Sequence, residues 1–190
     1  KKKKKTYILN QLGLQDFKVI NVDDVYEKLL KDTLGKEDFG SMSPEELSTA
    51  GKLMGKARVV TREKETQALE NLENIIIDGT GAASRPLLKK KQQLEDLGYD
   101  TFMVLIYVSP MVSLKRNFQR GRSLPTSAVL TSWDGVMKNI NLYKQEFGNN
   151  ITLINNDPEN ADKSFDPNSI IKLLAQPKGK PKTPELFSFF

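Results

Sequence analysis

Short apolar runs alternate with longer segments of helical pattern along this chain. The runs have strand length and lie at residues 17–22, 74–77, 101–108 and 151–154. Helices are expected between them, at residues 7–12, 24–31, 43–72, 84–98, 110–120, 126–147 and from 166. This alternation predicts an α/β fold of three layers with a mainly parallel sheet.

Local signals fix several of the expected helix ends. Ser43, Pro44 and Glu46 form a capping-box pattern at the start of the 43–72 helix, which we expect to be interrupted between Gly51 and Gly55. The apolar side of residues 126–147 predicts one long helix, closed by a glycine. Residues 101–108 are apolar throughout, as in a parallel strand covered on both faces.

The composition excludes several kinds of chemistry. The 190 residues contain no cysteine and no histidine, so disulfides, thiolate metal sites, zinc-hydrolase chemistry and Ser-His-Asp triads are excluded. Proton transfer must therefore use Asp, Glu, Lys or Tyr. No apolar run approaches the roughly 20 residues of a membrane span, so no membrane partner is expected.

The charge balance is mildly basic. A net charge of +5 favours phosphate-bearing ligands. Part of it lies in the five lysines at positions 1–5. We expect these lysines to mark a piece or processed form of a longer chain, and a genuine basic arm is the alternative.

Polar motifs follow three of the predicted strands, where open parallel sheets bind ligands. Asp23-Asp24 follows the first strand, Asp78-Gly79-Thr80-Gly81 the second, and Ser109-Pro110 the third. Asp23 could activate a substrate hydroxyl or help to hold magnesium, or it could simply cap the next helix. The second motif offers a carboxylate and a hydroxyl between glycines that allow close approach, and its alternative is a plain turn.

Basic residues suggest phosphate chemistry at two further places. Arg116 and Arg120 are four residues apart, on one face of the expected helix, and Arg122 follows. Such arginines can neutralise charge on a phosphoryl group in transfer, although a solvated basic face is the alternative. Lys5-Thr6 would be the last two residues of a phosphate-binding loop if glycines preceded them.

Several of these motifs resemble P-loop kinases of the zeta-toxin and phage polynucleotide-kinase type. Residues 74–81 (NIIIDGTG) and 97–101 (LGYDT) are similar to a strand, turn and following strand of zeta toxins. Residues 19–24 (VINVDD) resemble the polynucleotide-kinase strand that ends in the hydroxyl-activating aspartate. Residues 114–121 (LKRNFQRG) and 124–125 (LP) resemble that kinase's lid.

The resemblance covers most of residues 5–155 and implies a three-layer P-loop kinase-like domain over 1–175 that uses ATP and magnesium. In that family the strand before the glycine-rich loop is central in the sheet, and it would precede Lys5. The chain departs from polynucleotide kinase at Tyr26, where that kinase has an arginine. The implied roles are Asp23 as general base, Asp78 and Thr80 as contacts to the acceptor or the metal site, Arg116 and Arg120 as stabilisers of the transferred phosphate, Lys5, Thr6 and Arg122 as ATP contacts, and Thr6 as a magnesium ligand.

Residues 176–190 are rich in proline and lysine and end in an apolar group. We expect an extended tail whose Leu186, Phe189 and Phe190 dock into a partner, because their spacing resembles sliding-clamp-binding peptides. The alternative is that these side chains, with Phe187, pack back onto the domain.

Two functions remain open from the sequence. The first is an ATP-dependent kinase acting on a hydroxyl of a nucleotide, nucleic-acid end or nucleotide sugar. The second is an inactive kinase-fold scaffold that serves as an interaction or phage virion protein through its tail. The expected location is the cytoplasm, that of the host if the gene is a phage gene, or the virion.

Overall fold

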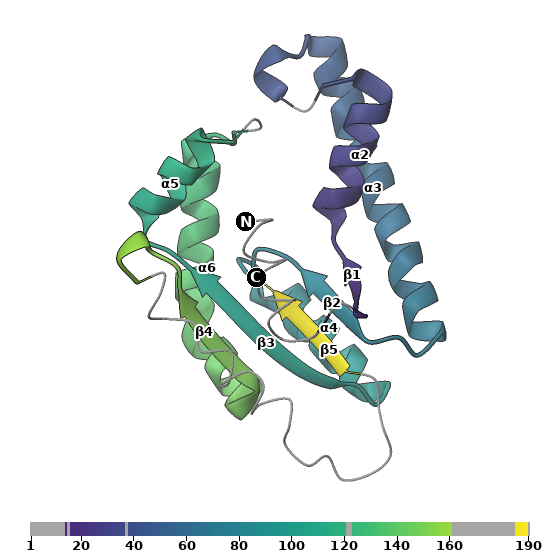
Figure 1. Cartoon of the computed structure of the whole chain (residues 1–190), viewed down its shortest axis with the longest axis vertical. Coiled ribbons are helices and arrows are strands. Elements are labelled where there is room, and N and C mark those ends of the chain that lie inside the picture. Colours follow the sequence, from purple (N-terminus) through teal and green to yellow (C-terminus); the bar gives the residue numbers. More distant parts are fainter. Residues whose placement is uncertain (1–13, 15, 37, 121–122, 161–184, 190) are drawn as a thin grey trace.

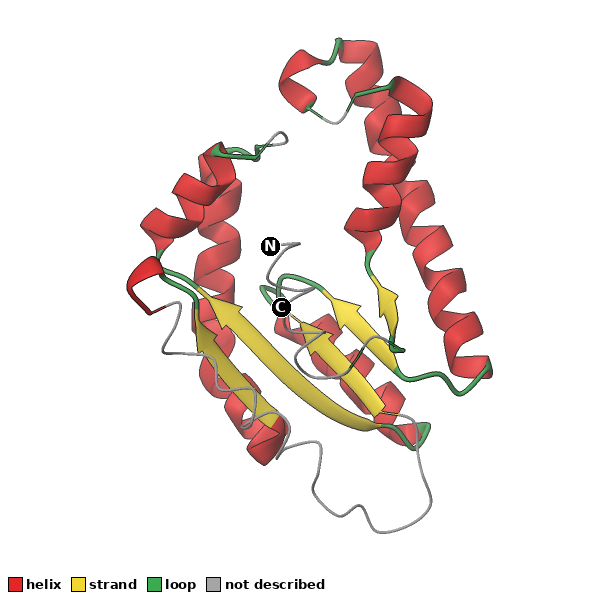
Figure 2. Cartoon of the chain, in the orientation of Figure 1, coloured by secondary structure: helices red, strands yellow, loops and turns green. Residues whose placement is uncertain are grey.

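A computed structural model of the chain describes residues 14, 16–36, 38–120, 123–160 and 185–189 (Figures 1 and 2). In this part the fold is α/β, with five parallel strands in one sheet of order β1-β2-β5-β3-β4. The α/β class and the parallel sheet predicted from the pattern are thus confirmed. The strands are β1 (Lys18–Ile20), β2 (Ile75–Asp78), β3 (Asp100–Tyr107), β4 (Ile151–Asn155) and β5 (Glu185–Phe189).

The helices between the strands follow the local signals closely. The capping box of Ser43 and Glu46 is formed at the start of α3, and α6 ends directly before Gly148. The expected interruption near Gly51 is wrong, because α3 is one continuous helix. The helices expected at 7–12 and from 166 lie outside the described residues. The α-helices are α2 (Val22–Leu34), α3 (Pro44–Glu70), α4 (Ser84–Asp96), α5 (Pro110–Phe118) and α6 (Thr126–Phe147), with single 3₁₀ turns at Phe39–Ser41, Gly148–Asn150 and Pro158–Asn160.

Strand β5 lies between β2 and β3, in the middle of the sheet (Figure 1). Its backbone pairs in parallel with both neighbours, and Leu186 is in register with Ile75 on one side and Thr101 on the other. The expectation that residues 176–190 form a docking tail therefore needs correction for residues 185–189. These residues belong to the chain's own sheet, because their main chain pairs with β2 on one side and with β3 on the other.

The sheet is covered by α4 and α6, which lie behind it in the view of Figure 1. Leu94 of α4 packs with Ile75 and Tyr99, and these side chains are buried. Tyr143 of α6 packs with Met103 of β3. The continuous apolar run of β3 is explained by its position, since its residues Phe102–Leu105 are all buried.

Helices α2 and α3 pack against each other and extend past the carboxyl ends of the strands (Figure 1). Their contact is a separate apolar cluster centred on Tyr26, Leu30 and Ala57. Tyr26 is 3% exposed, and its hydroxyl donates to the carbonyl of Ala50 at 3.1 Å. The pair of helices thus has a small core of its own, beyond the sheet.

The position of β5 predicts a strong effect of proline at Ser188. Ser188→Pro removes an amide hydrogen in a strand paired on both sides, which should lower the free energy of unfolding by about 1–3 kcal/mol or more. Ser188→Ala keeps that hydrogen and is the matched control, with a clearly smaller loss expected. Urea unfolding of the full chain measures both, and equal stability of the two variants would contradict the strand assignment.

Candidate active site

Asn21 joins two of the polar motifs predicted from the sequence. It is the N-cap of α2, and its side-chain oxygen accepts a hydrogen bond from the Asp23 amide at 2.8 Å. Its side-chain nitrogen donates to Oδ2 of Asp78, also at 2.8 Å. Because β1 and β2 are neighbours, the start of α2 and the end of β2 meet at one edge of the sheet.

The N-terminus of α2 is capped by Asn21 and not by Asp23, the cap considered from the sequence. Asp23 and Asp24 lie in the first turn of α2, and both are exposed. Carboxylates in the first turn are stabilised there by the helix dipole. The backbone of Asp23 is thus linked to Asp78 through the side chain of Asn21, and the Asp23 residue is exposed to solvent.

Two side chains of α6 bind the turn that follows Asp78. The hydroxyl of Tyr143 donates to the carbonyl of Gly81 at 2.7 Å, and the side-chain amide of Asn139 donates to the carbonyl of Ala82 at 3.0 Å. Burial raises the pKa of the Tyr143 phenol above its ordinary value, although a hydrogen bond with Asn139 lowers it in part. Thr80, in the same turn, is exposed.

The arginines lie at the other side of the sheet, near the ends of β3 and β4. Arg116 is in the last turn of α5, and its guanidinium donates to the carbonyl of Asn156 at 2.8 Å. Arg120 lies beyond the helix, which ends at Phe118, so the two arginines do not share a helical face as expected. Arg122 lies outside the described residues, as do Lys5, Thr6 and Phe190.

Two clamps that sequence reasoning missed hold this arginine-bearing segment. The buried Asn117 side chain donates to the carbonyl of Leu124 at 2.8 Å and accepts from the Leu124 amide at 2.9 Å, which closes the loop after α5. Asp157 is buried and accepts from both the amide and the hydroxyl of Ser109, the N-cap of α5. Of the residues in these contacts, only Ser109 was indicated by the sequence, as part of the helix start at Ser109-Pro110.

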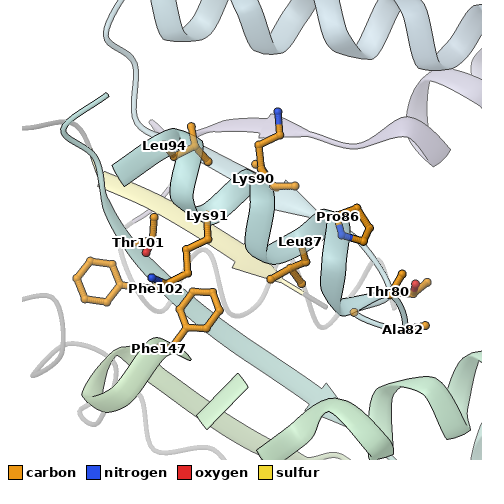
Figure 3. Close-up of a pocket in the computed structure, with 13 residues that line it drawn as sticks. Thr80, Ala82, Pro86, Leu87, Lys90, Lys91, Leu94, Thr101, Phe102 and Phe147 are labelled. Atoms are coloured by element: carbon orange, nitrogen blue, oxygen red, sulfur yellow. The ribbon is translucent and has the colours of Figure 1, made fainter. Parts of the chain in front are cut away.

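A cavity of about 280 Å³ is bordered by the turn at residues 80–83, α4, β3 and Phe147 of α6 (Figure 3). Most of its lining is apolar. Its two lysines are already paired, since Lys90 lies 2.6 Å from Glu65 and Lys91 lies 2.7 Å from Glu95. Among the described residues that line the cavity, neither lysine is thus left without an acidic partner to bind a phosphate.

The structure thus brings Asp23, Asp78 and Thr80 to adjoining segments, and it places Arg116 and Arg120 across β5 from them. All of these residues lie at or beyond the carboxyl ends of their strands. Leu186 and Phe189 are in β5, where the backbone of Phe189 is in register with Asp78. Among the described residues, no group of three or more acidic side chains is close enough to hold a metal ion alone. None of the described helices is long and apolar enough to cross a membrane.

No protein-family model, curated protein or solved structure matches this chain.

The double role of Asn21 predicts the outcome of two substitutions. Asn21→Ala removes both the helix cap and the bond to Asp78, and it should lower the free energy of unfolding by about 0.5–2 kcal/mol. Asn21→Ser keeps a capping oxygen on a side chain too short for Asp78, and it should recover the capping part of that loss. Urea unfolding gives both values, and wild-type stability of the alanine variant would show that neither contact matters.

Proposed function

We propose that this protein is a kinase that transfers the terminal phosphate of ATP to a hydroxyl of a nucleotide, nucleic-acid end or nucleotide sugar. The observation that carries the proposal is the hydrogen-bonded junction of Asn21 with Asp78 and with the amide of Asp23. It joins two carboxylate-bearing segments at the carboxyl edge of a parallel sheet, which is where α/β enzymes bind substrates. The resemblance to P-loop kinases then suggests the chemistry.

In this mechanism Asp23 accepts the proton of the acceptor hydroxyl, which its exposed position allows. The acceptor oxygen forms a bond to the γ-phosphorus as the bond to the β–γ bridging oxygen breaks. The products are ADP and a phosphate monoester. Asp78 and Thr80 orient the acceptor, and Arg116 and Arg120 offset negative charge on the transferred group.

Magnesium fits this set of donors without a dedicated cage. The ion is usually held by one or two carboxylates together with substrate phosphates, and Asp23 and Asp78 offer such oxygens. A bound magnesium ion would neutralise part of the negative charge of the phosphates. Thr6, a ligand implied by the resemblance, lies outside the described residues.

The acceptor class is narrowed by Tyr26. The polynucleotide kinases that the chain resembles have an arginine at this position. Here the side chain is buried between α2 and α3 and bonded to the Ala50 carbonyl, so it offers no charge to a nucleic-acid backbone. A nucleotide or nucleotide sugar is therefore favoured over a polynucleotide end.

One observation favours the second candidate, an inactive kinase-fold scaffold. In the resembled kinases the strand that leads into the phosphate loop is central, and β5 occupies the central position here. A strand before Lys5 would have no place between β2 and β3. Titration of the full chain with Mg·ATP by calorimetry separates the candidates, because a scaffold should release no heat of binding.

The kinase proposal predicts that Asp23→Asn lowers kcat by about 10²- to 10⁴-fold, because the amide cannot accept the hydroxyl proton. Affinity for Mg·ATP should stay nearly unchanged. The assay follows phosphate-monoester formation by mass spectrometry with a nucleoside, a nucleotide sugar and a 5′-hydroxyl oligonucleotide as separate acceptors.

Asp24→Asn is the matched control, since Asp24 is exposed in the same helical turn. It should retain turnover. Transfer to none of the three acceptors by the unmodified chain would contradict the kinase proposal, and full turnover of Asp23→Asn would remove Asp23 from the mechanism.

A further inference from the structure

One face of α6 contacts the turn between β2 and α4 at three places. Gly135, Asn139 and Tyr143 are four residues apart in sequence, so they form a row along one side of the helix. Each of the three contacts Gly81 or Ala82. A row with one common target indicates a dedicated contact between the helix and the turn.

Gly135 allows the helix to approach this closely. A β-carbon at position 135 would lie 2.8 Å from the carbonyl oxygen of Ala82, and 3.3 Å from its β-carbon. Glycine is disfavoured inside helices because of its backbone entropy, so its presence in α6 is explained by this contact. Any other residue would push the helix and the turn apart.

Asn139 and Tyr143 bind two consecutive carbonyls of the turn. Tyr143 is fully buried, and Gly81, whose carbonyl it binds, is buried as well. Gly81 has a φ of 66°, a left-handed conformation that glycine adopts without strain. Because each peptide unit is planar, fixing two successive carbonyls fixes the path of the turn at Gly81 and Ala82.

The turn lacks the restraint that a helix N-terminus usually provides. Ala83 is the N-cap of α4, and no side chain caps the helix there. The segment is held instead at its start by the bond from Asn21 to Asp78 and near its end by α6. Thr80 lies between these two anchors and is exposed.

We propose that Gly135, Asn139 and Tyr143 of α6 are positioning residues that hold the turn at residues 79–83 so that Thr80 and Asp78 are presented together to the acceptor. The acceptor role rests on the proposed function, whereas the restraint on the turn does not. A turn that is already held loses less conformational freedom when the acceptor binds. Removing the restraint should therefore raise the KM for the acceptor.

Tyr143→Phe tests the proposal with the smallest change, because it removes only the hydroxyl. Loss of one buried hydrogen bond should raise the KM for the acceptor about tenfold, with the KM for ATP and kcat nearly unchanged. Amide hydrogen exchange should become faster at residues 79–84 and stay the same in α2 and α3. This second measurement needs no activity.

Asn139→Ala should have the same two effects. Its matched control is Asn141→Ala, an exposed asparagine on the same helix. Gly135→Ala should also weaken acceptor binding, although alanine favours helix, whereas Gly55→Ala in α3 should not, since nothing lies within 4 Å of its site.

The outcomes separate the inference from the proposed function. If the unmodified chain transfers no phosphate, the acceptor role is overturned, and hydrogen exchange alone decides whether α6 restrains the turn. If the chain is an active kinase but Tyr143→Phe changes neither the acceptor KM nor the exchange of residues 79–84, the positioning role is overturned while the kinase stands. A general loss of protection across the molecule would show that Tyr143 serves only the core.

Discussion

The pairing of β5 with β2 and β3 is the interaction on which the rest of the structure depends. Both neighbours present inner edges whose amide and carbonyl groups need partners in the middle of a sheet, and β5 supplies them from the end of the described chain. This closure joins segments far apart in sequence, so it carries the entropic cost of closing a long loop. The closure also sets Asp78, the last residue of β2, against the β3 side of the sheet, whereas the start of α2 is aligned with Asp78 by the direct pairing of β1 with β2.

Around this sheet, the two sides of the candidate site are held in different ways. On the side of β1 and β2, Asn21 binds Asp78, and Asn139 and Tyr143 of α6 bind the turn that follows it. On the side of β3 and β4, Asp157 and Asn117 fix both ends of the segment around α5. Many of these anchors bind main-chain atoms. They therefore fix the path of the chain and leave the side chains of Thr80 and Arg120 to face solvent.

The sequence predicted those elements whose ends have local causes. Ser43 and Glu46 cap α3 through their own side chains, and α6 runs unbroken to Gly148. It did not predict β5, because a short apolar group after a proline- and lysine-rich stretch has no local sign of a central strand. It offered Asp23 as a possible cap of α2, whereas the cap is Asn21, and both residue types suit that position. Arg120 was placed in a helix, whereas the helix ends at Phe118, next to the Asn117 clamp on Leu124.

Helices α2 and α3 contribute both to packing and to the candidate active site. Their cluster around Tyr26 and Leu30 is separate from the two clusters that cover the sheet. The pair therefore keeps its own shape and is joined to the sheet through β1 and the end of α3. At the β1 junction, the bond from Asn21 to Asp78 ties the first turn of α2 to the neighbouring strand. The pairing of β1 with β2 brings these two segments together, and this one side-chain amide serves both as helix cap and as the link between them.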